Sequence, residues 1–125
     1  MSVAFWCVLI AGVLPIVAAT IAKAGGERFS NRNPRGWLAK QEGFRARANA
    51  AQLNSFEAFP FFAAAVIVAQ LTQAPAERVD ALAVIFVVAR VAYLVSYLGN
   101  WHWVRSVVWL IGWLATITIF VSGVH

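Results

Sequence analysis

Four long stretches of apolar residues restrict the fold of this chain more than any other feature of its sequence. They run over residues 2–22, 48–71, 81–98 and 106–124, and Glu57 and Arg90 are the charged residues within them. An α-helix needs about 20 apolar residues to cross the hydrocarbon core of a bilayer. A spanning helix also satisfies its own backbone hydrogen bonds, which hydrocarbon cannot do. The sequence therefore predicts an all-α membrane protein, a bundle of four transmembrane helices.

The connections between the spans support an antiparallel bundle. The third helix is expected over residues 77–98, which begins before its apolar run, because Pro75 suits the first turn of a helix. The short turn before it makes the second and third helices neighbours. In the longer first loop, Trp37, Leu38, Gln41 and Phe44 recur at nearly helical spacing, which predicts one short helix at the membrane surface.

Composition agrees with a single membrane domain over residues 1–125. The chain is 62% hydrophobic and 12% charged, whereas soluble domains average roughly half apolar and a quarter charged. A net charge of +5 could indicate nucleic acid, but the basic residues gather in one loop between apolar spans, so no nucleic-acid partner is expected. The single cysteine, Cys7, excludes an internal disulfide and a cysteine-based metal cluster, and no metal site is expected.

The lysines and arginines predict the orientation in the membrane. Seven of the ten lie in the first loop, Arg105 precedes the fourth span, and the turn between the second and third spans holds only Arg78. Because cytoplasmic loops carry an excess of these residues, the first and third loops are expected in the cytoplasm and both termini outside.

Polar side chains inside two spans are the candidates for function. Arg47, Asn54 and Glu57 share one face of the second helix, and Arg90, Tyr93 and Tyr97 share one face of the third. Glu57 and Arg90 both lie about 10–12 Å from the cytoplasmic end, at 1.5 Å per residue. Because charges at such depth usually pair, the sequence predicts a buried ion pair between Glu57 and Arg90. From spacing alone, that pair could be structural or functional.

The other polar residues also have structural explanations. Asn54 could serve as a hydrogen-bonding group between helices. Tyr93 and Tyr97 could anchor the protein at the membrane interface, as Trp101 and Trp103 are expected to do. Arg105 could serve only to fix orientation. No serine–histidine–acid set, phosphate-binding glycine loop or metal-ligand pair stands out.

The two polar motifs resemble those of a known family. The run RANAAQLNSFEAFPF, from Arg47 to Phe61, resembles the second-helix signature of the MAPEG family, membrane-associated proteins in eicosanoid and glutathione metabolism. The run RVAYLVSYLG, from Arg90 to Gly99, and the following Arg105 and Ser106 resemble its third helix and the start of its fourth. The resemblance covers essentially the whole chain, and the small bacterial branch of the family fits better than the mammalian enzymes.

The resemblance implies a homotrimer in the membrane, here the bacterial inner membrane, with glutathione bound as co-substrate between adjacent subunits on the cytoplasmic side. It implies an enzyme of glutathione S-transferase or glutathione peroxidase type, acting on a small hydrophobic electrophile or a lipid peroxide from the bilayer. By position, glutathione would be bound or supported by Arg47, Asn54, Glu57, Arg90, Tyr93 and Tyr97.

Arg105 and Ser106 are the expected catalytic residues. A free thiol has a pKa near 8.5 and is mostly protonated at neutral pH, so a thiol enzyme must stabilise the thiolate. Arg105 remains cationic, the Ser106 hydroxyl could donate a hydrogen bond, and the fourth helix begins here with its positive dipole end. Family resemblance supports this role.

Two positions depart from the family pattern. Ala50 stands where well-studied members have an arginine that binds a carboxylate of glutathione, and Gly36 stands where one of them has an aspartate. The departures leave open a protein of the same fold that binds a lipid or partner without catalysis, and Glu57 leaves open a small proton-coupled transporter. The second substrate and the identity of the thiol are also open.

Overall fold

The chain folds into long helices, as its apolar stretches predict. The computed structural model describes residues 1–24 and 32–124, and these residues form five α-helices without any strand. The helices are α1 (Val3–Lys23), α2 (Pro34–Ala39), α3 (Gly43–Leu71), α4 (Ala76–Leu98) and α5 (His102–Val121). Four of them, all except α2, are long and apolar enough to cross a membrane. The predicted all-α bundle of four spans is confirmed.

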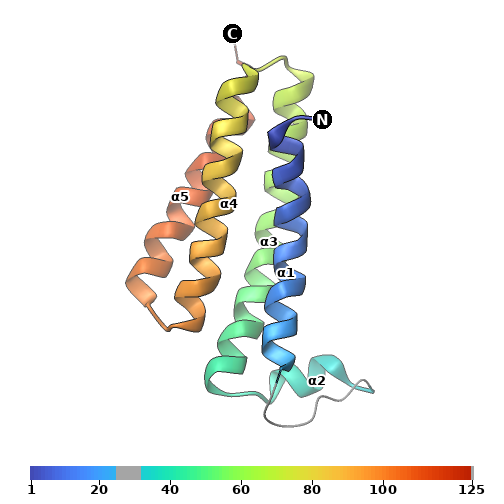
Figure 1. Cartoon of the computed structure of the whole chain (residues 1–125), viewed down its shortest axis with the longest axis vertical. Helices are drawn as coiled ribbons and strands as arrows, with labels where there is room; N and C mark the ends of the chain where they lie inside the picture. The colour runs from blue at the N-terminus through green and yellow to red at the C-terminus, as the bar shows by residue number, and fades with distance from the viewer. Residues whose placement is uncertain (25–31, 125) are drawn as a thin grey trace.

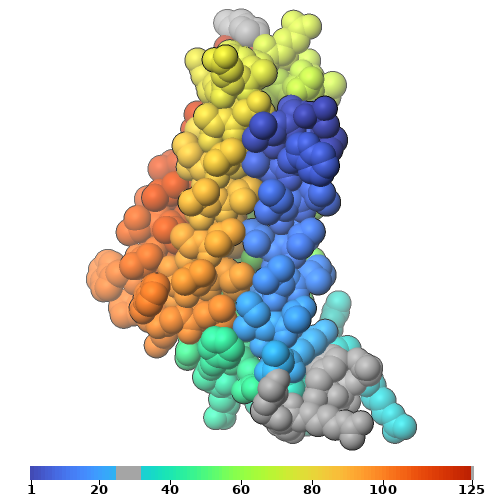
Figure 2. All heavy atoms as spheres, in the orientation of Figure 1, coloured from blue at the N-terminus to red at the C-terminus, as the bar shows by residue number. Residues whose placement is uncertain are grey.

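The four long helices run antiparallel in chain order (Figure 1). The start of α1 and the end of α5 lie at one end of the bundle, while α2 and the α4–α5 turn lie towards the other. The most extensive packing is between α1 and α3 and between α4 and α5. Helix α1 also lies alongside α4 (Figure 2). The assignment of the α2 end to the cytoplasm stays a prediction.

Small residues let the helices approach closely in the core. Buried alanines line the α1, α3 and α4 faces that meet, and the Phe62 and Phe86 rings stack between α3 and α4 with centroids 3.9 Å apart. Large apolar side chains such as Leu9, Val88 and Leu110 point outward instead. Small residues inside and large apolar residues outside are typical of helices that pack in lipid.

Polar contacts fix the end of the bundle where the chain begins. The Ser2 hydroxyl accepts a hydrogen bond from the Phe5 amide at 3.2 Å, which caps α1. The Asp80 carboxylate on α4 accepts a hydrogen bond from the Ala4 amide at 2.9 Å. An acidic group therefore lies at the positive end of the α1 dipole.

The short surface helix is smaller than the spacing predicted. Asn33 caps α2, which ends at Ala39, and α3 begins at Gly43 with φ +60°. A residue with this left-handed backbone interrupts helical geometry. The predicted short helix in the first loop is present as α2 and includes Trp37 and Leu38, whereas Phe44 belongs to α3. Trp37 and Leu38 are buried against α1 and α3.

Candidate functional site

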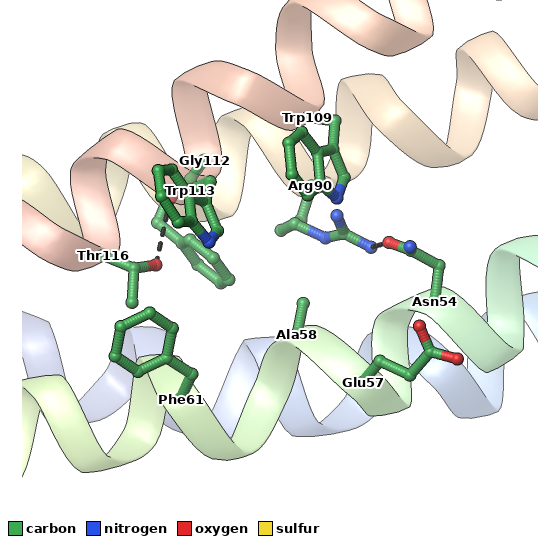
Figure 3. A pocket seen from close by; sticks show the side chains of 10 residues that line it. Asn54, Glu57, Ala58, Phe61, Arg90, Trp109, Gly112, Trp113 and Thr116 are labelled. Carbon is green, nitrogen blue, oxygen red and sulfur yellow. Dashed lines mark hydrogen bonds between the residues drawn. The ribbon is translucent and has the colours of Figure 1, made fainter.

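Two adjoining hollows bring the predicted polar residues together between α3, α4 and α5. The outer hollow has a volume of about 190 Å³, and its walls are Asn54, Tyr93, Arg105, Ser106 and Trp109. The inner hollow has a volume of about 250 Å³, and its walls are Asn54, Glu57, Ala58, Phe61, Phe86, Arg90, Trp109, Gly112, Trp113 and Thr116 (Figure 3). Asn54 and Trp109 belong to both, so the two hollows meet at these side chains.

Arg90 is held by an amide rather than by a carboxylate. Its side chain is buried on α4, and Nη2 donates to Asn54 Oδ1 at 2.6 Å and to Ser55 Oγ at 3.5 Å (Figure 3). Within the described residues Arg90 donates to these two groups and not to Glu57, so the predicted Glu57–Arg90 ion pair is wrong. Glu57 is an exposed side chain on the same face of α3 and borders the inner hollow.

Helix geometry explains this choice of partner. Asn54 and Glu57 lie three residues apart, so both can face α4. The short Asn54 side chain meets the Arg90 guanidinium directly, whereas the Glu57 carboxylate lies to one side of it (Figure 3). Matched depth therefore identified the correct pair of helices and the wrong residue on α3.

A continuous row of ring and guanidinium contacts runs from Arg90 on α4 to Arg105 on α5. The Arg90 guanidinium carbon lies 4.3 Å from the centroid of the Tyr93 ring. The Tyr93 and Tyr97 rings meet edge to face, with centroids 5.6 Å apart and an angle of 68°. Arg105 on α5 lies 4.4 Å from the Tyr97 centroid. Cation–π contacts thus hold Arg105 against α4 and position its charge at the outer hollow.

Arg105 and Ser106 lie in the first turn and a half of α5. No side chain caps this helix at Trp101, and the Arg105 amide is bonded to the Trp101 carbonyl at 2.9 Å. The amides of the first turn have no partner inside a helix, which favours an anion at this end. The Ser106 hydroxyl donates to the His102 carbonyl at 3.1 Å, so it must leave this bond before it can donate to a ligand.

Arg47 has a different place from the other predicted ligands. Its Nε and Nη2 donate to the Leu98 carbonyl at 3.3 and 3.2 Å, which ties the start of α3 to the end of α4. Neither hollow includes Arg47 in its walls. Its role as a glutathione ligand stays a prediction. Tyr97 likewise lies behind the outer hollow, where it supports Arg105.

One of the two departures from the family pattern has a structural explanation. The Gly36 amide donates to Asn33 Oδ1 at 3.1 Å in the cap of α2. A Cβ atom at Gly36 would clash with the Asn33 side chain, so this cap and a larger residue exclude each other. Nothing in the structure explains Ala50, which is half-buried on α3.

The aromatic walls of the inner hollow were not singled out from the sequence. Phe61 comes from α3, and Trp109 and Trp113 come from α5, where their rings stack at 6.2 Å with an angle of 11°. A signal was present, because Trp109, Gly112, Trp113 and Thr116 recur at the spacing of one helix face. Aromatic residues that face lipid often have the same spacing, so the sequence alone does not distinguish a hollow from a lipid-facing surface.

The site combines a fixed cation with an apolar chamber. An anion can bind beside Arg105 and the start of α5, and an apolar molecule can bind among the rings of the inner hollow. Among residues 1–24 and 32–124, no cluster of three or more histidine, cysteine or acidic side chains could hold a metal ion. This arrangement suits chemistry carried out by a bound anionic nucleophile.

Comparison with known proteins gives one match. The model of one protein family, described as the MAPEG family, matches residues 3–125, essentially the whole chain. Neither the curated proteins nor the solved structures contain a significant match.

Proposed function

The chain belongs to the MAPEG family, and we propose that it is a membrane enzyme that uses glutathione to attack a small hydrophobic electrophile or a lipid peroxide. The observation that carries this proposal is the position of Arg105. Its guanidinium rests on the Tyr97 ring and lines the outer hollow, at the exposed start of α5.

Arg105 would act by stabilising the thiolate of glutathione. A thiol with a pKa near 8.5 is mostly protonated at neutral pH, whereas an arginine stays charged at any working pH. A sulfur atom in the outer hollow would lie near this cation and close to the positive end of the α5 dipole. Arg105 is half-buried, so water screens its charge less than it would at a fully exposed site.

The rest of glutathione would lie along the α3 face. Glu57 is exposed there, and within the described part of the chain no cation pairs with it, so it could accept hydrogen bonds from the ammonium group. Asn54 and Tyr93 line the path between Glu57 and Arg105. Glutathione placed this way would cover the opening of the inner hollow.

Substitution of Arg105 tests the proposal. Arg105→Lys should retain part of the glutathione-dependent conjugation of a generic aryl halide, and Arg105→Leu should lose most of it, because only lysine keeps a cation near the sulfur. Arg78→Leu is the matched control, since it removes an exposed arginine at the opposite end of α4. All variants should insert equally and bind glutathione in isothermal titration. Equal turnover in wild type, Arg105→Leu and Arg105→Lys would refute the catalytic role.

We also propose that the enzyme is a homotrimer whose subunits cover Glu57. A charged side chain in the middle of a span costs at least about 2.5–3.5 kcal/mol, and Glu57 is exposed on a single subunit. A neighbouring subunit over this face would relieve that cost and complete the glutathione site. Native mass measurement in detergent should give a trimer, and a monodisperse monomer would count against it.

A second candidate function rests on the same Glu57. A carboxylate paired with Arg90 would be a poor proton carrier, and that pair is not formed. A transport path must reach both membrane surfaces, however. The walls of the hollows stop at Phe61 on α3, Phe86 on α4 and Thr116 on α5. At 1.5 Å per residue these positions are about 15, 15 and 7.5 Å short of the far helix ends. This observation favours the enzyme. Proton flux into liposomes that contain the purified protein would instead favour the transporter.

Isothermal titration separates the enzyme from a binding protein of the same fold. An enzyme of this type must bind glutathione in detergent or nanodiscs. A protein that binds only lipid or a protein partner would give no heat with the thiol.

A further inference from the structure

The interior of the inner hollow has no role in the chemistry proposed for Arg105. Its volume of about 250 Å³ is larger than the roughly 150 Å³ of an apolar cavity that accepts benzene. It is smaller than the roughly 300–1,000 Å³ typical of sites for drug-sized ligands. A molecule of two fused six-membered rings has an intermediate size.

The walls favour a flat aromatic molecule over a saturated one. Phe61, Phe86 and Trp113 bring rings from three different helices to one chamber, and smaller side chains at Ala58 and Gly112 leave the space between them (Figure 3). Aromatic rings attract one another in edge-to-face or offset arrangements, beyond the gain from burying apolar area. A flexible hydrocarbon chain of equal area lacks that contribution.

One polar group in the chamber selects for an oxygen atom on the ring. The Arg90 side chain is 4% exposed and borders the hollow. Both hydrogen bonds that it donates within the described chain leave from Nη2, so the hydrogens on Nε and Nη1 remain for a ligand. A guanidinium carries five N–H donors, so Arg90 can donate to a ligand without leaving Asn54 or Ser55. A ring carbonyl would supply the acceptor.

We propose that the inner hollow is the acceptor site for a flat bicyclic aromatic carbonyl compound of the naphthoquinone class. The proposal rests on the function proposed above, since glutathione would supply the nucleophile from the outer hollow. The thiolate sulfur forms a bond to a ring carbon, and the electron pair of the adjacent C=C bond moves to the carbonyl oxygen beside Arg90. That oxygen takes up the proton that the thiol released, and the ring proton shifts to the second oxygen. One thiol and one quinone thus give one thioether hydroquinone, without an external oxidant.

Binding is best tested without glutathione, using a stable ligand of the same shape. The probe is a naphthyl methyl ketone with an azide on its naphthalene ring. Light cross-links it to the protein in nanodiscs, and peptide mass spectrometry maps the labelled residues. Labels are expected on residues that line the hollow, among them Asn54, Ala58 and Phe61 of α3 and Trp109, Trp113 and Thr116 of α5. Ala58→Leu should fill the chamber and reduce labelling by about tenfold or more. Ala64→Leu is the matched control, because Ala64 is exposed on the same helix and lines neither hollow.

Competition on the wild-type protein keeps the test decisive if Ala58→Leu fails to insert. Unlabelled naphthyl methyl ketone should compete best, naphthalene less well, and the saturated decalin ketone least. Equal competition by decalin ketone or by decane would mean that the hollow accepts any hydrocarbon, such as a lipid chain, and would overturn the proposal. Labels spread over outward-facing residues such as Val88 and Leu110 would do the same.

The two proposals can fail separately. Arg105→Leu should leave labelling unchanged while it loses most of the conjugation. Normal labelling without any thiol conjugation in the wild type would refute the enzyme and leave the ligand site in place. Conjugation of a small aryl halide without labelling would refute the bicyclic acceptor site alone.

Discussion

The bond between Arg90 and Asn54 gives the sharpest test of the structure. Asn54→Ala removes the acceptor at 2.6 Å and leaves the buried guanidinium with Ser55 Oγ at 3.5 Å. Hydrogen bonds to charged groups contribute about 1.5–3 kcal/mol, whereas polar contacts between membrane helices average about 0.6 kcal/mol. Because this bond is short, charged and buried, we expect a loss of about 2 kcal/mol. Glu57→Gln leaves this bond intact, so any change in stability that it causes should be independent of Arg90.

Unfolding by increasing dodecyl sulfate in mixed micelles measures both losses, provided that native mass measurement shows the same oligomer in each variant. Arg90→Met supplies the second arm of a double-mutant cycle, in which the coupling to Asn54 should be about 2 kcal/mol and the coupling to Glu57 close to zero. Asn49→Ala is the matched control, because Asn49 is a half-buried asparagine on the same helix outside both hollows.

The reasoning is refuted if the coupling of Glu57 to Arg90 equals or exceeds the coupling of Asn54 to Arg90. That result would restore the ion pair that depth matching predicted. It would also remove the free carboxylate on which the proposed glutathione position relies.

Two further predictions concern the ends of helices, and a third concerns the orientation of the chain in the membrane. Asp80→Ala should cost about 1 kcal/mol in the same unfolding assay, because it removes a cap from the first turn of α1, while Glu77→Ala should be nearly neutral. Arg47→Met should cost about 1–2 kcal/mol through the lost bonds to Leu98. If Arg47 is also the predicted ligand, the glutathione affinity in isothermal titration should fall, and an unchanged affinity would exclude that role. A phosphatase that is active only outside the cytoplasm should be active when fused after residue 125 and inactive when fused within the first loop, and the reverse pattern would invert the predicted orientation.

The fold could be predicted because span length is a strong physical constraint. An apolar run long enough to cross a bilayer can hardly be anything except a helix. The exact ends could not be predicted in the same way. Helix α3 begins at Gly43 and α5 at His102, both ahead of the apolar runs at residues 48 and 106. Hydropathy identifies the part of a helix that suits lipid, whereas a helix continues through Arg45 and Arg47 wherever their side chains can find water or a partner.

The site could be predicted only as far as helix faces. Spacing placed Asn54 and Glu57 on the face of α3 that meets Arg90, and the structure agrees. Spacing could not choose between them, because an arginine side chain is long enough to contact either, and the rotation of α3 decides which one it meets. Trp109 and Trp113 were equally hidden, since an exposed tryptophan on a spanning helix is usually a lipid contact.

The choice of partner at Arg90 changes what the site can do. Had Glu57 neutralised Arg90, the inner hollow would contain a closed ion pair with little left to offer a ligand. With Asn54 as the acceptor, the net positive charge of Arg90 remains beside the hollow, and the negative charge of Glu57 remains on the open α3 face. A zwitterionic thiol and a carbonyl compound can then each find a complementary group. The neutral Asn54 side chain separates the two charges and lies where the two hollows meet, which is where a sulfur atom from one hollow would reach a ring carbon in the other.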